Sequence, residues 1–327
     1  MRSVSVDPLR PKTLAEFKGQ PDISAELNIV LQAAKTRQEV PPHLLFSGPP
    51  GLGKTTLAAI TARECGLPLV STAAPSLEKP GDLVALLVGL SEPSVVFVDE
   101  IHQLPKAVEE TLYSAMEDGR IDIVIGEGST QARVIPMALE SFTLVGATTT
   151  SGSLGAPFRD RFGYIGRLTP YDTPTLQQIV AHNSNLIGME ISSSAAGEIA
   201  LRSRGTPRVA NKLLRRVHDW STVSMVTNID LLEVNQALSA FGVDEKGLGR
   251  VDRSLLLALC ENFNGGPVGL STLAASVGES EITISEEHEP FLMRSGLLAR
   301  TGRGRIATEA AWLHLDLTPP REQQEAV

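Results

Sequence analysis

The sequence predicts an α/β fold with a mainly parallel sheet, followed by a small all-helical domain and a C-terminal winged helix. Three observations predict this order. A short apolar strand, a Gly-rich turn and a helix start follow one another near residue 50. Apolar strands then alternate with helical patterns up to about residue 168, and the last part of the chain combines helices with a Gly-containing hairpin. Alternating strands and helices are typical of a parallel sheet flanked by helices.

The length of the chain, 327 residues, is too great for one ordinary core and indicates several domains. We expect an N-terminal arm at 1–20, a large domain at 21–168, a small helical domain at 169–243, a winged helix at 244–316 and a disordered tail at 317–327. The strands predicted for the large domain are 43–47, 68–71, 95–98 and 142–147. The small domain should open on a helix with Thr173 as its cap and Pro174 in its first turn.

Composition narrows the classes of function. The net charge of −9 argues against a generally basic nucleic-acid coat protein, but it leaves room for a local DNA contact. No apolar run reaches transmembrane length and no export signal is evident, so we expect a cytoplasmic protein without a membrane partner. The two cysteines, Cys65 and Cys260, lie far apart and suggest neither a disulfide nor a zinc site.

The strongest motif is the run from Gly48 to Thr55, which fits the phosphate-loop pattern G-x-x-x-x-G-K-[ST] at every fixed position. Lys54 is expected to reach the outer phosphates of a nucleotide, and the Thr55 hydroxyl to ligate Mg²⁺. Gly51 and Thr56 complete the predicted nucleotide-binding set. The alternative is a Gly/Pro surface turn, but a strand before the loop and a helix after it favour an anion site.

A second motif, the apolar run 95–98 followed by Asp99 and Glu100, indicates hydrolysis. The carboxyl end of this strand should lie beside the phosphate loop. Asp99 can then hold Mg²⁺, and Glu100 can orient and deprotonate the attacking water. The alternative is a strand that meets solvent with two ordinary acids. The strand at 142–147 should be its neighbour and should bring the hydroxyls of 148–150 close to the phosphates.

Several further strings carry a family resemblance. These are Asp99-Glu100-Ile101-His102, Gly146-Ala147-Thr148-Thr149, Arg159-Asp160-Arg161-Phe162-Gly163, Gly205-Thr206-Pro207-Arg208, Leu9-Arg10-Pro11-Lys12, Leu77-Glu78-Lys79-Pro80-Gly81-Asp82, Ala115-Met116-Glu117-Asp118, Gly265-Gly266-Pro267-Val268-Gly269-Leu270 and Arg303-Gly304-Arg305. With them the chain resembles the AAA+ ATPases, and more narrowly the RuvB family of bacterial Holliday-junction motors. The resemblance covers about residues 8 to 315.

The resemblance implies ATP and Mg²⁺ as cofactors. It also implies roles for single residues that the spacing of the motifs does not indicate. By itself Arg161 would be read as a surface charge, but the family implies an arginine finger that enters the neighbouring subunit's ATP site. Thr149 would be sensor 1, and Arg208 would be sensor 2 within its own subunit. Two further groups are implied. Leu9, Arg10 and Tyr171 match positions that hold the nucleotide, and Glu117, Asp118 and Gly119 match a segment near the nucleotide at the subunit boundary.

The resemblance also implies partners. A homo-oligomeric, hexameric ring would encircle the duplex arms of a Holliday junction, and the hairpin at 121–139 would dock on RuvA. The alternative for this hairpin is an ordinary buried one; an exposed apolar tip would fit docking. In the last domain, Arg300 and Arg305 are the stronger candidates for DNA phosphate contacts and Arg303 is the weaker, against the alternative of a solvated loop. The arginine-rich run at 202–216 is better explained as a solvated helix face, apart from Arg208.

Three positions depart from the family pattern: Thr150, Gly119 and Gly302, the last standing for a proline in the wing. The expected function is ATP-driven branch migration with RuvA in recombination and repair. One rival is a clamp-loader-type AAA+ switch that acts on a sliding clamp; the wing arginines and the hairpin speak against it. The other is an ATP-gated DNA-binding regulator, which intact Glu100 and Arg161 disfavour.

Overall fold

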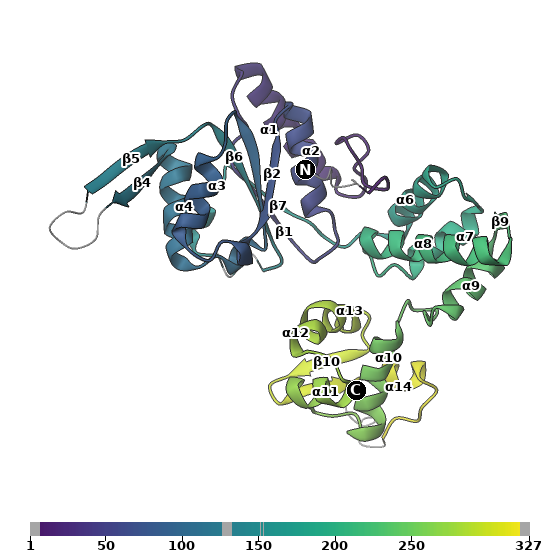
Figure 1. Cartoon of the computed structure of the whole chain (residues 1–327). Helices are drawn as coiled ribbons and strands as arrows, with labels where there is room; N and C mark the ends of the chain where they lie inside the picture. The colour runs from purple at the N-terminus through teal and green to yellow at the C-terminus, as the bar shows by residue number, and fades with distance from the viewer. Residues whose placement is uncertain (1–6, 126–132, 151, 153, 321–327) are drawn as a thin grey trace. The chain divides into compact units, whose positions relative to one another are not determined.

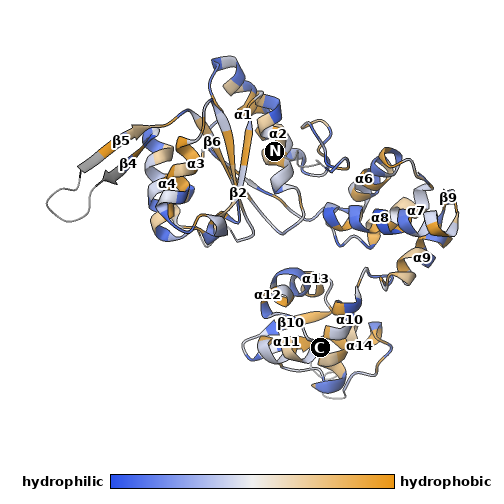
Figure 2. Ribbon diagram, in the orientation of Figure 1, coloured by the Kyte–Doolittle hydropathy of each residue, from blue (hydrophilic) through white to orange (hydrophobic). Residues whose placement is uncertain are grey.

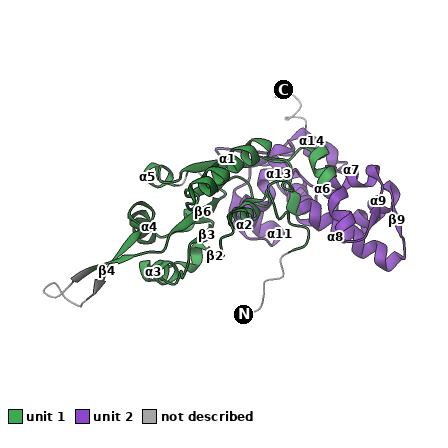
Figure 3. Cartoon of the chain, turned by 90° about the horizontal axis from the view of Figure 1, so that it is seen from above, with its two compact units in different colours: residues 1–179, 206–208 green, residues 180–205, 209–327 purple. Residues whose placement is uncertain are grey.

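The computed structural model describes residues 7–125, 133–150, 152 and 154–320 (Figure 1). The chain forms two compact units (Figure 3), one of residues 1–179 with 206–208 and one of residues 180–205 with 209–327. This division does not coincide with the five predicted segments, whose boundaries stay predictions. No helix in the described ranges is long and apolar enough to cross a membrane.

The first unit is built on a five-stranded parallel sheet with the strand order β2-β3-β6-β1-β7. Its strands are β1 (Leu44–Ser47), β2 (Leu69–Ala73), β3 (Ser94–Asp99), β6 (Phe142–Thr148) and β7 (Tyr164–Arg167). The predicted parallel sheet is confirmed, and β3 and β6 are neighbours as expected. The edge strand β7 was not predicted.

Helices cover both faces of this sheet. α3 (Pro80–Val88) and α4 (Lys106–Asp118) lie on one face, and α1 (Pro21–Arg37) and α2 (Lys54–Cys65) lie on the other (Figure 1). The 3₁₀ turns Ala74–Ser76 and Ile101–Gln103 and the short α5 (Ala156–Arg159) complete the layer. The apolar strands form the orange centre of the sheet in Figure 2.

The core between the sheet and α3–α4 contains Val96, Val98, Leu87, Leu112 and Phe158, all buried. Full burial of such a side chain contributes about 1.5–3 kcal/mol. The apolar run of β3 therefore fixes the position of the two carboxylates at its end.

An antiparallel hairpin follows α4, formed by β4 (Arg120–Ile125) and β5 (Arg133–Ala138). The pairing of Ile121 with Met137 lies within the hairpin predicted at 121–139. The apolar tip expected there falls on 126–132, outside the described residues. Ile121 is buried in the core while Ile135 is 45% exposed, so apolar surface remains on the described arms.

The helical part that follows contains α6 (Thr173–Leu186), α7 (Ser193–Leu201), α8 (Pro207–Ser224) and α9 (Leu231–Ala240). Two-residue strands, β8 (Glu190–Ile191) and β9 (Asn228–Ile229), pair in parallel, an addition to the predicted all-helical arrangement.

The predicted cap of α6 is wrong. The helix begins at Thr173, and the Asp172 carboxylate accepts a hydrogen bond from Thr175 N at 2.9 Å. Asp172 is thus the capping residue, because a carboxylate one position earlier reaches the unpaired N–H groups of the first turn.

The C-terminal part is a winged helix. It contains α10 (Arg250–Leu257) with a π-helical extension (Ala258–Asn262), α11 (Leu270–Val277), α12 (Glu281–Thr283), a π-helical turn (Ile284–His288), α13 (Glu289–Arg294), β10 (Leu298–Thr301), β11 (Gly304–Ala307) and α14 (Glu309–His314). Its core includes Leu255, Leu259, Leu273, Leu292 and Trp312. The predicted wing hairpin is formed by β10 and β11.

Glycine is required at one end of the wing. Gly304 has φ +142°, and a Cβ there would lie 2.4 Å from the carbonyl oxygen of Val268. Arg305 N and Val268 N each donate to the other residue's carbonyl oxygen, at 2.8 and 2.9 Å, so Val268 forms an isolated antiparallel bridge to the hairpin. Gly302, in contrast, has open space and no positive φ.

Candidate nucleotide-hydrolysis site

The phosphate loop connects buried β1 to the N-terminus of α2. Gly48, Gly51 and Gly53 have φ values of +137°, +80° and +115°, a conformation that L side chains rarely adopt. Gly53 is the N-cap of α2 and supplies no side-chain hydrogen bond, so the first N–H groups of the helix have no side-chain cap. Such a helix start binds anions.

The Lys54 side chain is buried in this loop, with the residue only 6% exposed. Its Nζ donates to the carbonyl oxygens of Gly48, at 2.6 Å, and Pro49, at 3.1 Å. Burial lowers the pKa of Lys54 from its ordinary value, and the carboxylates of Glu100 and Asp99 oppose that shift. A buried cation beside an uncapped helix start fits a polyphosphate, whose negative charge would compensate Lys54.

The two carboxylates stand where the parallel sheet was expected to place them, at the end of β3. Glu100 has φ +48°, a left-handed conformation that is uncommon for a residue with a side chain, and its N–H donates to Asp99 Oδ1 at 3.0 Å. The Thr149 hydroxyl, at the end of the neighbouring β6, donates to Glu100 Oε2 at 3.3 Å. The structure thus brings three of the predicted residues together.

His102 joins the same carboxylate and was given no role from the sequence. Its Nδ1 lies 3.3 Å from Glu100 Oε2 and 3.0 Å from the Thr148 hydroxyl. The signal that could have found it is the histidine two positions after Glu100 in the Asp-Glu-Ile-His string. Thr150, one of the departures, donates its N–H to the Thr148 hydroxyl at 3.1 Å.

Arg208 also packs on the phosphate loop. Its N–H donates to Gly51 O at 3.3 Å, and a Cβ on Gly51 would lie 3.0 Å from Arg208 Cβ. The positive charge of Arg208 acts on Lys54, where it contributes to the lowered pKa. Two cations therefore converge on the loop, as binding of a triphosphate requires.

Of Leu9, Arg10 and Tyr171, the three residues that the resemblance implies hold the nucleotide, Tyr171 contacts the phosphate loop. Its hydroxyl donates to Leu52 O at 3.1 Å, and a Cβ on Gly19 would lie 2.2 Å from its ring. Burial raises the pKa of Tyr171 far above its ordinary value, so it stays a neutral donor. Leu9 is buried and Arg10 is exposed. Thr55 and Thr56, in the first turn of α2, are half-buried.

Arg161, expected as the finger, contacts α4 of its own chain. Its guanidinium forms an ion pair with Glu117 at 3.0 Å and lies 4.5 Å from the centre of the Tyr113 ring. It also donates to Pro157 O, whereas its buried Nε has no hydrogen-bond partner among the described residues. Tyr113 was missed from the sequence, although Tyr113 and Glu117 lie four positions apart and so share one helix face.

The other two residues of the predicted boundary segment are at the end of α4. Gly119 caps this helix with φ +61°, so glycine relieves backbone strain at this departure from the family pattern. Asp118 pairs with Arg120 at 3.8 Å, and both side chains are largely exposed.

The three wing arginines lie in two different environments. Arg300 and Arg303 are exposed, but Arg305 is only 8% exposed and its guanidinium pairs with Glu289, with Nη2 and Nε 3.0 and 3.2 Å from the carboxylate oxygens. The strong ranking of Arg305 as a phosphate contact is not supported by this geometry, because a DNA contact would leave buried Glu289 unpaired. The contact of Arg300, Arg303 and Arg305 with DNA phosphates stays a prediction.

Comparisons with known proteins agree along almost the whole chain. Residues 9–168 match the family described as Holliday junction DNA helicase RuvB P-loop domain, residues 171–244 match the RuvB AAA lid domain, and residues 245–316 match the RuvB C-terminal winged helix domain.

Among curated relatives, the Holliday junction branch migration complex subunit RuvB of Corynebacterium glutamicum is 53% identical over 95% of this chain and 86% of its own length. The protein of that name from Mycobacterium avium is 51% identical over 95% of this chain and 89% of its own length. A solved structure titled Thermotoga maritima RuvB Holliday junction branch migration motor has a TM-score of 0.85 and 46% identity, and covers 96% of this chain and 100% of that one.

The fold and the site define a P-loop ATPase with an AAA+ lid and a winged helix. The chain belongs to the RuvB family. It is an ATP hydrolase, and its large domain binds nucleotide.

Proposed function

We propose that this chain is the ATP-driven motor of Holliday-junction branch migration in homologous recombination and DNA repair. The observation that carries the proposal is the meeting of Lys54, Glu100 and Thr149 at one edge of the sheet, in a chain whose three parts all match RuvB domains. The relatives named above are subunits of a branch-migration complex.

The contacts support the following hydrolytic roles. Lys54 and the N–H groups at the start of α2 bind the β- and γ-phosphates of ATP, with Gly51 and Thr56 lining the loop. Glu100 orients the attacking water and accepts its proton; Thr149 and His102, which both approach Glu100 Oε2, hold that carboxylate in place. Arg208 senses the γ-phosphate through the loop that it contacts.

Thr55 and Asp99 fit a Mg²⁺ site, because both are oxygen ligands beside the loop and both are only partly buried. When bound, Mg²⁺ neutralises charge that develops on the phosphate oxygens. Leu9, Arg10 and Tyr171 hold the base and sugar side of the nucleotide in this proposal.

Arg161 acts in trans in a hexameric ring. The side-chain contacts found for Arg161 are with Tyr113, Pro157 and Glu117, none of which belongs to the phosphate loop of its own chain. A finger supplied by a neighbour would make hydrolysis depend on assembly of the ring. Glu117, Asp118 and Gly119 would lie at the same boundary.

The proposed partners are DNA, at the winged helix, and RuvA, at the β4–β5 hairpin. The exposed Arg300 and Arg303 of the wing would hold DNA phosphates, which carry little sequence information and so suit a motor that steps along a duplex. The β4–β5 hairpin would dock on RuvA, and the exposed Ile135 on its described arm is consistent with an apolar contact.

Branch migration of a synthetic four-way junction tests the proposal. With RuvA, Mg²⁺ and ATP, the wild-type chain should separate the junction into two duplexes, and Lys54→Ala should not, since it removes the buried cation of the loop. Hydrolysis of ATP without any movement of the junction would contradict the motor function.

The clamp-loader alternative is not favoured, because the C-terminal domain is a winged helix that matches the RuvB model. The non-hydrolysing regulator is not favoured either, because family membership makes the chain an ATP hydrolase.

A further inference from the structure

The short segment 204–208 has contacts of two kinds. Its last residues pack on the phosphate loop: Arg208 N donates to Gly51 O at 3.3 Å, and a Cβ on Gly51 would lie 2.8 Å from Thr206 Cγ2. Its first residue, Arg204, contacts the winged helix instead. Residues that contact the phosphate loop and a residue that contacts the winged helix are thus separated by a few peptide bonds.

Arg204 is held by three groups. Its Nε donates to Gly247 O at 2.8 Å, its guanidinium forms an ion pair with Asp252, and its Cζ lies 4.6 Å from the centre of the Phe291 ring. The backbone of Arg204 is left-handed, with φ +59°. A residue with a side chain keeps such a conformation where its surroundings determine it, and such positions cluster at functional elements.

Asp252 is the centre of the contact. It lies in the first turn of α10, is 1% exposed and accepts hydrogen bonds from Gly249 N at 2.8 Å and from His288 Nδ1 at 2.6 Å. Burial alone would raise the pKa of Asp252, but the hydrogen bond from His288 and the charge of Arg204 outweigh it, and the pKa is lowered. The carboxylate stays ionised, so a movement that withdrew Arg204 would weaken the pairing of a buried charge.

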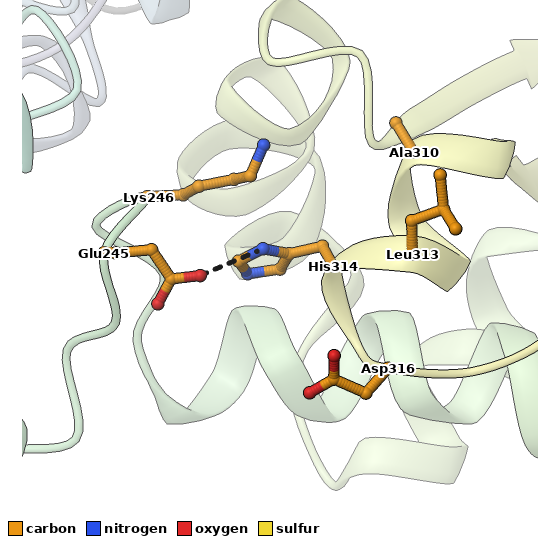
Figure 4. Close-up of a pocket in the computed structure, with 6 residues that line it drawn as sticks. All are labelled: Glu245, Lys246, Ala310, Leu313, His314 and Asp316. Carbon is orange, nitrogen blue, oxygen red and sulfur yellow. Dashed lines mark ion pairs between the residues drawn. The ribbon is translucent and has the colours of Figure 1, made fainter.

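The linker between α9 and α10, residues 241–249, also has contacts on two sides. A Cβ on Gly247 would lie 2.3 Å from Arg202 O, and Arg202 Nη1 donates to Val243 O at 3.4 Å. On the other side, His314 Nε2 lies 2.8 Å from Asp244 and its Nδ1 lies 3.4 Å from Glu245, the ion pair drawn in Figure 4. The linker is therefore a packed element, unlike a flexible tether.

We propose that Arg204, with Asp252 and His288, fixes the helical domain to the winged helix, so that movement of the segment 204–208 during ATP turnover is transmitted to the DNA-binding wing. This inference rests on the proposed motor function. Arg204 acts as a positioning residue in this proposal, through its contacts with Gly247, Asp252 and Phe291.

The test measures two rates in the full-length chain with RuvA and a synthetic four-way junction: ATP hydrolysed and junctions separated. Arg204→Gln should keep ATP turnover within about twofold of the wild-type rate and lower the number of junctions separated per ATP about fivefold or more. The matched control is Arg216→Gln, which removes an arginine that stacks 4.7 Å from the Phe241 ring inside the helical domain. The control should keep the wild-type ratio.

Two variants approach the contact from the winged-helix side. Asp252→Asn removes the charge, and Phe291→Leu removes the stacking partner without leaving a buried charge unpaired, so it applies even where the other variants do not fold. Both should lower the same ratio. Combining Arg204→Gln with Asp252→Asn should lower it no further than either alone, because both break one link.

A ratio for Arg204→Gln and Phe291→Leu equal to that of Arg216→Gln would overturn the inference. So would a parallel fall of ATP turnover and junction separation, which would place Arg204 in hydrolysis itself. Failure of the wild-type chain to move the junction would instead contradict the proposed function, and the two failures are therefore distinguishable.

Discussion

Glu100 is the residue on which the chemistry of the site converges. Its backbone is left-handed, and Thr149 and His102 both approach the same carboxylate oxygen. This geometry fixes the carboxylate before substrate arrives, which favours a general base that must orient one water molecule.

Glu100→Gln should separate binding from hydrolysis. The amide keeps the size of the side chain but cannot accept a proton, so ATP should still bind while turnover falls about 100-fold or more. Nucleotide affinity and steady-state ATP hydrolysis measure the two effects. Loss of ATP binding, or turnover within a few fold of wild type, would argue against this role.

The guanidinium of the proposed finger, Arg161, lies over the ring of Tyr113, and we expect this ring to orient it. Tyr113→Leu removes the surface over which the Arg161 guanidinium lies, whereas Tyr113→Phe keeps it. We expect Leu to lower kcat of assembled rings about 3- to 10-fold with KM for ATP unchanged, since an arginine–aromatic contact contributes about 0.5–2 kcal/mol. Phe should behave like the wild type. If Tyr113→Leu and Tyr113→Phe lowered kcat equally, stacking of the ring on Arg161 would not explain the loss.

The wing illustrates how one element gives two similar residues different roles. Arg300 and Arg305 stand directly opposite each other on β10 and β11. Arg300 is exposed, but Arg305 is buried against Glu289 of α13. The exposed arginine and its neighbour at the tip, Arg303, are available to a phosphate, and the buried one stabilises the domain.

Substitutions in the wing should therefore have distinct effects. Replacing Arg300 and Arg303 together by Ala should weaken DNA binding equally across sequences and reduce the salt slope by about 2, one unit for each lost phosphate contact. Arg305→Ala should instead lower the free energy of unfolding by about 3–5 kcal/mol, because Glu289 loses its buried partner. Salt titrations and denaturant melts measure these. If Arg305→Ala left the free energy of unfolding unchanged and reduced the salt slope of DNA binding, Arg305 would be a phosphate contact and not a stabilising residue.

The Asp252 contact should be visible in the pH dependence of stability. The pKa of Asp252 in the folded chain lies below its ordinary value of 3.8. Its contribution is thus present above that ordinary value and is lost as pH falls toward the folded-state pKa. The difference in free energy of unfolding between wild type and Asp252→Asn should be about 3 kcal/mol near pH 7 and should shrink below about pH 4. If the difference in free energy of unfolding between wild type and Asp252→Asn stayed constant down to pH 3, the ionised Asp252 carboxylate would not be its cause.

At the scale of elements, sequence patterns predicted what periodicity and glycine signals encode. The apolar runs predicted four of the five strands of the parallel sheet. The glycine pattern predicted the phosphate loop between the first of these strands and the helix that follows it. Strand β7 was missed because Tyr164-Ile165-Gly166-Arg167 is short, with polar ends and a glycine. The burial of Arg305 and the contact of Arg161 with Tyr113 could not be predicted, since both depend on partners, Glu289 and α4, that only packing brings near.

At the scale of the whole molecule, we propose that each ATP pocket is completed by a neighbouring subunit and that ATP turnover in it moves DNA. One chain carries the phosphate loop and Glu100 as one half of a site, and Arg161 held on α4 as the other half. The segment 204–208 would transmit the change to the wing. In a ring of identical chains, the phosphate loop and Glu100 of each subunit would lie beside Arg161 of its neighbour.

Mixing two inactive variants tests this claim most directly. Glu100→Gln damages the hydrolytic half and Arg161→Ala damages the finger half, so neither alone should hydrolyse ATP or move a four-way junction in the presence of RuvA. Rings assembled from both contain some pockets with intact Glu100 and an intact neighbouring Arg161, and we predict partial recovery of both activities. Mixed rings that remained as inactive as either variant alone would contradict a pocket shared between subunits.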